Sequence, residues 1–223
     1  MSKNVLVIGA SKGIGKELVS QFTKQGLETY GFARSFGNDS EDTVHHIHLD
    51  LLSPTIKTDF EQAISGINHI DYLVHNAGFI AVKPFLELSR EDIHKCYQVN
   101  VLSVMEITQV CIPKMKPGGH IVMISSIGGF QGSLKFPGLS AYSTSKAALV
   151  SLTELLAEEF KQSGIAINCL CLGAVQTEMM EEAFPGYLAP HRPAEIAEFI
   201  VDFTLNNGTY FHGKIIPVSV SNP

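Results

Sequence analysis

The stretch that decides the fold is Val5-Leu6-Val7-Ile8-Gly9-Ala10-Ser11-Lys12-Gly13-Ile14-Gly15. It opens with an unbroken apolar run, which is typical of a strand buried on both faces of a parallel sheet. Apolar residues at helical spacing follow the glycines and predict a helix over residues 14–24. Because the amino end of a helix presents unpaired N–H groups, a glycine turn between a first strand and a first helix predicts a phosphate-binding site.

The glycines of this turn, Gly9, Gly13 and Gly15, are expected to have different tasks. The first permits a sharp exit from the strand, the second lets a pyrophosphate approach the backbone, and the third lets the helix pack closely. Their GxxxGxG spacing differs from the GxGxxG fingerprint of dinucleotide sites. A tight turn without a ligand is the alternative, and the place of the turn after the first strand favours binding.

The rest of the chain alternates between strand-like and helix-like segments. Apolar runs predict further strands near residues 28–33, 44–49, 70–75, 120–125, 165–172 and 214–218. Helical spacing predicts helices near residues 54–65, 90–111 and 141–163, and a last one after Pro193. This alternation predicts an α/β fold with a doubly wound, mostly parallel sheet and helices on both faces, in three α/β/α layers. Since no linker or repeat is visible, residues 1–223 are expected to form a single domain, in which 173–192 is a loop over a ligand or an irregular connection.

The composition argues against several classes of function. Apolar residues make up 45% of the chain and the formal net charge is -6, which argues against a nucleic-acid-binding surface. No apolar stretch reaches membrane-spanning length, and residues 5–8 are too short for a signal peptide, so a cytoplasmic protein is expected. His45, His46 and His48 have no carboxylate or cysteine partner at ligand spacing, so no metal site is predicted. The cysteines are expected to be buried thiols: Cys96, Cys111, Cys169 and Cys171.

The end of the second predicted strand indicates which dinucleotide is bound. Dinucleotide sites place an acidic residue there, about twenty residues after the glycine turn, to hold the ribose 2′-hydroxyl. Here Arg34 and Ser35 occupy that region, and a guanidinium pairs with a 2′-phosphate where a carboxylate would repel it. Lys12 in the glycine turn adds a second positive charge. The sequence therefore predicts NADP(H) in preference to NAD(H), with a solvated Arg–Lys pair as the alternative.

Tyr142 and Lys146 stand four residues apart at the start of the long helix predicted near 141–163, and hence on one face of it. A phenol has an ordinary pKa of about 10 and is a poor acid or base at neutral pH. An ammonium group one turn away favours the phenolate and is expected to lower that pKa. The pair then suits proton transfer to a carbonyl oxygen while a nicotinamide supplies hydride. A surface Tyr beside a surface Lys is the alternative for this spacing alone.

Several motifs in a fixed order make the chain resemble a classical short-chain dehydrogenase/reductase over nearly its whole length. The resemblance rests on the glycine turn, Asp50 after the third strand, Asn76-Ala77-Gly78, and the Tyr142/Lys146 pair. It implies a Rossmann-type fold in which Asp50 contacts the adenine and Asn76-Ala77-Gly78 lies beside the cofactor. The cofactor contacts that it implies are Gly9, Ser11, Lys12, Gly13, Ile14, Gly15, Arg34, Ser35, Asp50, Leu51, Asn76, Ala77, Gly78, Tyr142, Lys146, Gly173, Val175 and Thr177.

The same resemblance implies a catalytic set of four residues: Asn100, Ser126, Tyr142 and Lys146. In it Tyr142 is the acid/base, Ser126 polarises the substrate oxygen, and Asn100 anchors a relay water through its backbone. Lys146 lowers the pKa of the tyrosine and holds the nicotinamide ribose. Ser125 is the competitor of Ser126, which is preferred because a glycine, Gly129, follows it at the family's spacing. Each of three residues has an alternative role when it is considered without the other motifs. Asp50 could cap a turn and Asn76 could be a turn residue. Asn100 could be a buried amide whose hydrogen bonds are satisfied by the backbone.

The chain also departs from the family pattern in places that bear on the substrate and on assembly. It has no proline before Gly173, and it carries extra residues between Ser126 and Tyr142 on the substrate side. The helices near 90–111 and 141–163 form the usual dimer interface in relatives, which implies a homodimer or homotetramer.

The leading hypothesis is an NADP(H)-dependent ketone or aldehyde reductase, or alcohol dehydrogenase, that acts on a small molecule and binds neither nucleic acid nor membrane. The alternatives are a non-catalytic NADP(H)-binding scaffold or regulator, and a sugar-nucleotide epimerase, for which little chain remains after Gly173.

Overall fold

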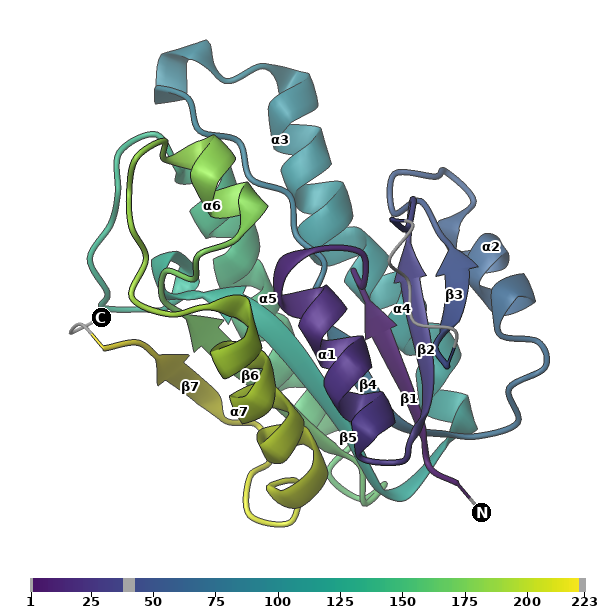
Figure 1. The fold of residues 1–223 in the computed structure, drawn as a ribbon. Helices are drawn as coiled ribbons and strands as arrows, with labels where there is room; N and C mark the ends of the chain where they lie inside the picture. The colour runs from purple at the N-terminus through teal and green to yellow at the C-terminus, as the bar shows by residue number, and fades with distance from the viewer. Residues whose placement is uncertain (1, 38–42, 221–223) are drawn as a thin grey trace.

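A parallel β-sheet runs through the middle of the protein, in a computed structural model that describes residues 2–37 and 43–220 (Figure 1). Seven strands of the described residues form this sheet in the order β3-β2-β1-β4-β5-β6-β7, and each neighbouring pair is parallel. The strands are β1 (Asn4–Ile8), β2 (Glu28–Ala33), β3 (His45–His48), β4 (Ile70–His75), β5 (Met115–Ser126), β6 (Ala166–Leu172) and β7 (Ile215–Val218). The strand order runs outward on both sides from β1 and β4, so the sheet is doubly wound in the Rossmann manner, as the sequence predicts.

Helices cover both faces of the sheet. They are α1 (Gly13–Lys24), α2 (Ile56–Ala63), α3 (Arg90–Tyr97), α4 (Ser103–Cys111), α5 (Ser140–Glu159), α6 (Glu178–Ala183) and α7 (Pro193–Asn206). Apolar side chains of α1 and α7 pack on one face, and those of α2, α4 and α5 pack on the other. Figure 1 shows α3 and α6 beyond the end of the sheet at which β1 and β2 finish. Within the described ranges no helix is both long enough and apolar enough to cross a membrane.

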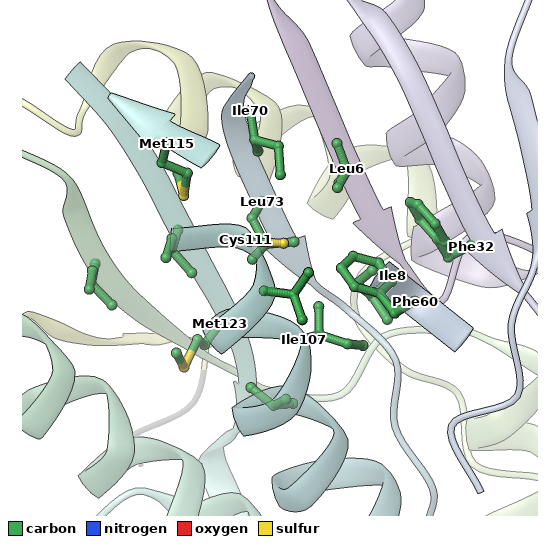
Figure 2. Close-up of a cluster of buried hydrophobic side chains, with 14 of the residues drawn as sticks. Leu6, Ile8, Phe32, Phe60, Ile70, Leu73, Ile107, Cys111, Met115 and Met123 are labelled. Atoms are coloured by element: carbon green, nitrogen blue, oxygen red, sulfur yellow. The ribbon is translucent and has the colours of Figure 1, made fainter. Parts of the chain in front are cut away.

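Strand β1 shows why its sequence is a continuous apolar run. Leu6 and Ile8 pack toward α2 and α4, whereas Val5 and Val7 pack toward α1 and α7. Successive side chains of a strand point to opposite faces, so a central strand with helices on both sides needs apolar residues at every position. Figure 2 shows the first of these clusters, with Leu6 and Ile8 near the ring of Phe60 from α2.

The four cysteines are free and buried, as predicted. Cys111 belongs to the cluster of Figure 2, and burial raises the pKa of its thiol.

Three elements differ from the sequence prediction. The helix near 90–111 is interrupted by a π-helical turn, Gln98–Leu102, between α3 and α4. Strand β5 begins at Met115, which pairs with Ile70, and its residues 116–119 bulge before His120 pairs with Tyr72. The stretch 173–192 contains the short helix α6, which Thr177 caps by accepting a hydrogen bond from the backbone of Met180 (3.2 Å). A helix of six residues is too short for an apolar stripe to be read in its sequence.

Candidate active site

The predicted site residues gather at the carboxyl edge of the sheet. Strands β1 and β4 are neighbours there, although the chain passes through β2 and β3 between them. In open α/β sheets this switch point is where ligands bind, because the connections from the two strands diverge and leave a crevice. The predicted cofactor residues other than Tyr142 and Lys146 all follow β1, β2, β3, β4 or β6, at the ends of these strands or shortly after them. The fold therefore brings together segments that are far apart in the sequence.

The glycine turn and the Asn76-Ala77-Gly78 motif are packed against each other. The side-chain amide of Asn76 donates a hydrogen bond to the carbonyl of Gly9 (2.7 Å), and Ala77 N–H donates to the carbonyl of Ile8 (2.7 Å). Gly9 has a φ of +88°, and a Cβ built on it would lie 2.6 Å from Cα of Ala77. A Cβ on Gly15 would overlap the carbonyl oxygen of Gly9. Neither glycine tolerates a side chain. Asn76 holds the turn by its hydrogen bond, so it has the turn role that was the alternative to a cofactor contact.

Gly13 sits where the segment after β6 meets the glycine turn. Its φ is +49°, and a Cβ on it would lie 3.0 Å from the methyl group of Thr177 and 3.4 Å from a carboxylate oxygen of Glu178. Ser219 fills the space beside Gly173, because its hydroxyl oxygen would lie 2.8 Å from a Cβ added to that glycine. Val175 is buried and pairs with His191. The chain from Gly173 to Glu178 is thereby held across the amino end of α1.

Two predicted cations lie exposed near the same edge. Lys12 immediately precedes α1, and Arg34 with Ser35 follows the end of β2. Asp50, which follows β3, accepts a hydrogen bond from Leu52 N–H (3.0 Å). Asp50 thus has the turn-capping role that was its alternative, with one carboxylate oxygen engaged in that bond.

Asn100 occupies the π-helical turn and is fully buried. Its side-chain oxygen accepts a hydrogen bond from Phe79 N–H (2.8 Å), and its amide nitrogen donates to Phe79 O (2.9 Å) and to Ser145 Oγ (2.8 Å). The side chain is therefore satisfied within the protein, so any part in a proton relay falls to its backbone. A Cβ on Gly78 would lie 3.6 Å from Lys146 Nζ and 3.7 Å from Asn100 Oδ1, which places these three residues together.

The two candidate serines have different partners. The side chain of Ser126 lies close enough to Tyr142 to lower the pKa of the phenol, and its hydroxyl accepts a hydrogen bond from Gly128 N–H (3.2 Å). Ser125 points to the opposite side, where it is buried and donates to the carbonyl of Lys146 (2.9 Å). The two serines thus point to different partners, and the preference for Ser126 stays a prediction.

The electrostatics of the Tyr142/Lys146 pair differ from the expectation. Burial raises the pKa of Tyr142, although the side chain of Ser126 lowers it in part. Burial lowers the pKa of Lys146 to about 8. The ammonium group donates one hydrogen bond to the carbonyl of Ile124 (2.8 Å), and Lys146 is not among the groups that shift the pKa of Tyr142. The expected lowering of the tyrosine pKa by this lysine is not found, because burial keeps the pKa of Tyr142 above its ordinary value.

Sequence reasoning missed two residues that hold this centre. Ser145 accepts from Asn100 and donates to the carbonyl of Tyr142 (2.7 Å), so it ties the π-helical turn to α5. Lys135 lies in the extra segment before Tyr142 and donates to the carbonyls of Gly128 (3.1 Å) and Phe130 (2.7 Å). The place of Ser145 between Tyr142 and Lys146 was a signal, whereas nothing in the sequence indicated the fold-back of Lys135.

Comparison with known proteins identifies the family. The sequence model of the short chain dehydrogenase family matches residues 3–187 of this chain. The chain belongs to the short-chain dehydrogenase family. Oxidoreductase UcpA of Salmonella typhimurium is 33% identical over 190 residues, which cover 80% of this chain and 72% of that protein. The 3-oxoacyl-[acyl-carrier-protein] reductase FabG of Aquifex aeolicus is 28% identical over 96% of this chain and 94% of its own length.

The structural comparison gives the same family. A short-chain dehydrogenase of Shigella flexneri 2a, crystallised in complex with NADP, superposes with a TM-score of 0.85 and 26% identity, covering 96% of both chains. The short-chain dehydrogenases are oxidoreductases that use a nicotinamide cofactor, so this chain is an oxidoreductase of that kind. The roles of the individual residues stay predictions.

Proposed function

We propose that this protein transfers hydride between NADP(H) and a carbonyl/alcohol pair, as a ketone or aldehyde reductase or an alcohol dehydrogenase. The observation that carries the proposal is that Ser126 lies against Tyr142, one turn of α5 before Lys146, at the edge of the sheet where the glycine turn lies. A screen of NADPH consumption against aldehydes, ketones and quinones tests it. Tight NADPH binding without consumption across the panel would instead favour a non-catalytic scaffold or regulator.

The residues present fit a dinucleotide. Gly9 and Gly15 leave no room for side chains of their own, so the amino end of α1 lies close against the end of β1 at the carboxyl edge of the sheet. Backbone N–H groups there suit a pyrophosphate. The residues proposed to hold the cofactor are those after β1, β2, β3, β4 and β6, with Lys146 at the nicotinamide ribose and Thr177 at the carboxamide.

The reaction divides between the cofactor and the chain. A bound NADPH would supply the hydride that the carbonyl carbon receives, with NADP⁺ as the oxidised product. Ser126 holds the carbonyl oxygen by a hydrogen bond, and Tyr142 donates its hydroxyl proton to that oxygen, so a ketone becomes a secondary alcohol and an aldehyde a primary one. The tyrosine proton is replaced through Lys146 and the backbone of the π-helical turn at Asn100. In the oxidation direction each transfer is reversed.

The preference for NADP(H) is testable at Arg34. We expect Arg34→Asp to weaken NADPH binding by about 10- to 100-fold, because a charge-assisted pair with the 2′-phosphate is lost and a repulsive carboxylate takes its place. NADH, which has no 2′-phosphate, is expected to bind with little change. Fluorescence titration with both cofactors measures this. Arg90→Asp, at the exposed start of α3, is the control for net charge, and equal affinities of the unmodified protein for the two cofactors would contradict the preference.

The role of Ser126 is testable against its neighbour. We expect Ser126→Ala to lower kcat by roughly 10²- to 10³-fold, because a hydrogen bond to the reacting oxygen is lost. It also removes the hydroxyl group that lowers the pKa of Tyr142, so the ascending limb of the pH profile for alcohol oxidation moves to higher pH. Ser125→Ala is the matched control and keeps the limb in place. A shift of the limb in the control and not in Ser126→Ala would overturn the assignment.

The proposal also covers the domain organisation, the location and the oligomeric state of the protein. The chain is proposed to act as one cofactor-binding domain in the cytoplasm, in agreement with its buried free thiols. A homodimer or homotetramer is proposed, and the helices that would meet in it carry exposed apolar side chains, among them Met105 on α4 and Leu155 on α5.

A further inference from the structure

An apolar groove lies between two loops on the substrate side of the molecule. It has a volume of about 330 Å³ and is lined by Val82, Lys83, Pro84, Pro137 and Gly138. The two loops are joined at its base, where Lys83 N–H donates to the carbonyl of Gly138 (3.0 Å). One wall follows the Asn76-Ala77-Gly78 segment, and the other belongs to the extra residues between Ser126 and Tyr142.

The groove lies next to the proposed catalytic centre, with one small buried cluster between the two. Ala81, next to Val82, is buried in a small cluster with Ala141, and the ring of Tyr142 packs on that cluster. Gly138 lies four residues before Tyr142, at the entry to α5. A substrate whose carbonyl oxygen contacts Ser126 and Tyr142 therefore has this groove beside it as a place for its remaining chain.

The cations beside the groove are already bound within the protein. The ammonium group of Lys83 pairs with Asp92 (2.7 Å), the residue that also caps α3 through Ser89. Lys135 donates to the carbonyls of Gly128 and Phe130 and to Ser133 Oγ (2.7 Å). Neither lysine is therefore available for a carboxylate or phosphate of a substrate without losing these bonds.

Exposed apolar side chains lie close in sequence to both loops of the groove. Phe85 is 72% exposed and Leu86 is 95% exposed, both on the short turn Phe85–Glu87 after the first loop. Leu134 and Phe136, which are also exposed, belong to the second loop. Several exposed apolar side chains on the two segments that form one groove favour a binding surface there.

We infer that the groove receives the alkyl chain of a neutral, elongated ketone or aldehyde, whose carbonyl is held at Ser126 and Tyr142. The inference rests on the proposed function and adds a substrate class to it. The chain leaves the reacting carbon between the two loops and displaces water from the side chains of Val82, Pro84 and Pro137. A substrate with an anionic chain is disfavoured, because its charge would enter this groove without a free cation.

A series of methyl ketones from 2-butanone to 2-decanone tests the groove in steady-state assays with NADPH. We expect kcat/KM to rise by roughly two- to fourfold for each methylene group that enters it. A neutral ester, ethyl 3-oxohexanoate, is expected to exceed the corresponding acid, 3-oxohexanoate, by at least about tenfold, because the groove has no free cation to offset the lost hydration of a carboxylate.

Val82→Asp places a charge in the groove. It is expected to abolish the rise of kcat/KM with chain length, because a carboxylate in the groove loses hydration when an alkyl chain enters. Val82→Thr, which keeps the shape of the side chain, is expected to lose only part of the rise. Tyr210→Asp, on the exposed connection between α7 and β7, controls for the added charge.

The outcomes separate this inference from the proposed function. Turnover with no dependence on chain length, or a preference for the acid over the ester, overturns the inference that the groove binds the alkyl chain. The reductase proposal would still hold. If no carbonyl compound is reduced, the proposed function fails, and calorimetric titration with 1-decanol then tests the groove alone. If 1-decanol binds and Val82→Asp weakens that binding, the result supports an alkyl-binding groove. If Val82→Asp leaves the binding unchanged, or if 1-decanol does not bind, the inference is overturned.

Discussion

Tyr142→Phe is expected to lower turnover by roughly 10²- to 10⁴-fold, the range that a lost general acid accounts for. The substitution removes one hydroxyl group and leaves the ring in its cluster with Ala81, Cys96 and Ala141, so the fold is expected to remain intact. Affinity for NADPH is expected to change little, because the cofactor is held chiefly by the glycine turn and the segments after the other strands. Steady-state kinetics together with fluorescence titration separate the two effects.

A second tyrosine supplies the control for this substitution. Tyr97 packs against the same cluster as Tyr142 but lies at the end of α3. Tyr97→Phe removes an identical hydroxyl group from the same neighbourhood and is expected to keep turnover within a few-fold of the unmodified protein. If Tyr142→Phe retains turnover, the assignment of the acid is wrong. If both variants lose turnover equally, disturbance of the cluster accounts for the loss.

Lys146→Met is expected to lose turnover and to gain stability. The ammonium group is lost from the proposed proton path, and a decrease of roughly 10²- to 10³-fold follows from the loss of one preorganised electrostatic group. Burial lowers the lysine pKa from 10.5 to about 8, so keeping the charged form in the fold costs about 3 kcal/mol at pH 7. Methionine removes that cost but leaves the carbonyl of Ile124 without its donor, which costs about 1 kcal/mol. A net gain of about 2 kcal/mol in the free energy of unfolding is expected.

The pH dependence of this gain identifies its cause. Between pH 8 and pH 10.5 the unfolded chain keeps a proton on Lys146 that the folded chain releases, so the free energy of unfolding of the unmodified protein rises with pH across that window. The advantage of Lys146→Met should therefore shrink from pH 8 to pH 10.5. Urea unfolding at several pH values measures it. Lys161→Met, which removes an exposed lysine paired with Glu158, is the control, and a gain that stays constant with pH would contradict the burial argument.

Much of the fold was predictable because its signals are local. The apolar run of β1 indicates a strand that is buried on both faces. The glycines after it indicate backbone positions where a side chain would collide with its neighbours. The exit at Gly26 has a φ of +80°, a conformation that glycine adopts without strain, so the end of α1 was also visible in the sequence. Each of these features depends on a few adjacent residues.

Other features were not predictable because they depend on contacts across the fold. The π-helical turn at Gln98–Leu102 inserts residues into a helix whose apolar spacing reads as continuous. The bulge at residues 116–119 is defined by the pairing of β5 with β4. The fold-back of Lys135 onto Gly128 and Phe130 needs two carbonyl groups that only the three-dimensional turn brings within reach of one side chain.

The glycine turn and the ordered motifs by themselves determined the doubly wound sheet, the family and the residues that meet at its carboxyl edge. This was possible because each motif follows a strand, and parallel strands end at one edge. Only the tertiary structure decided which way the side chains at that edge point. In the folded protein Ser126 lies next to the side chain of Tyr142, whereas Ser125 donates a hydrogen bond to the carbonyl of Lys146. The tertiary structure also aimed the lysine at Ile124, because burial and hydrogen-bond direction depend on neighbours that no local pattern records.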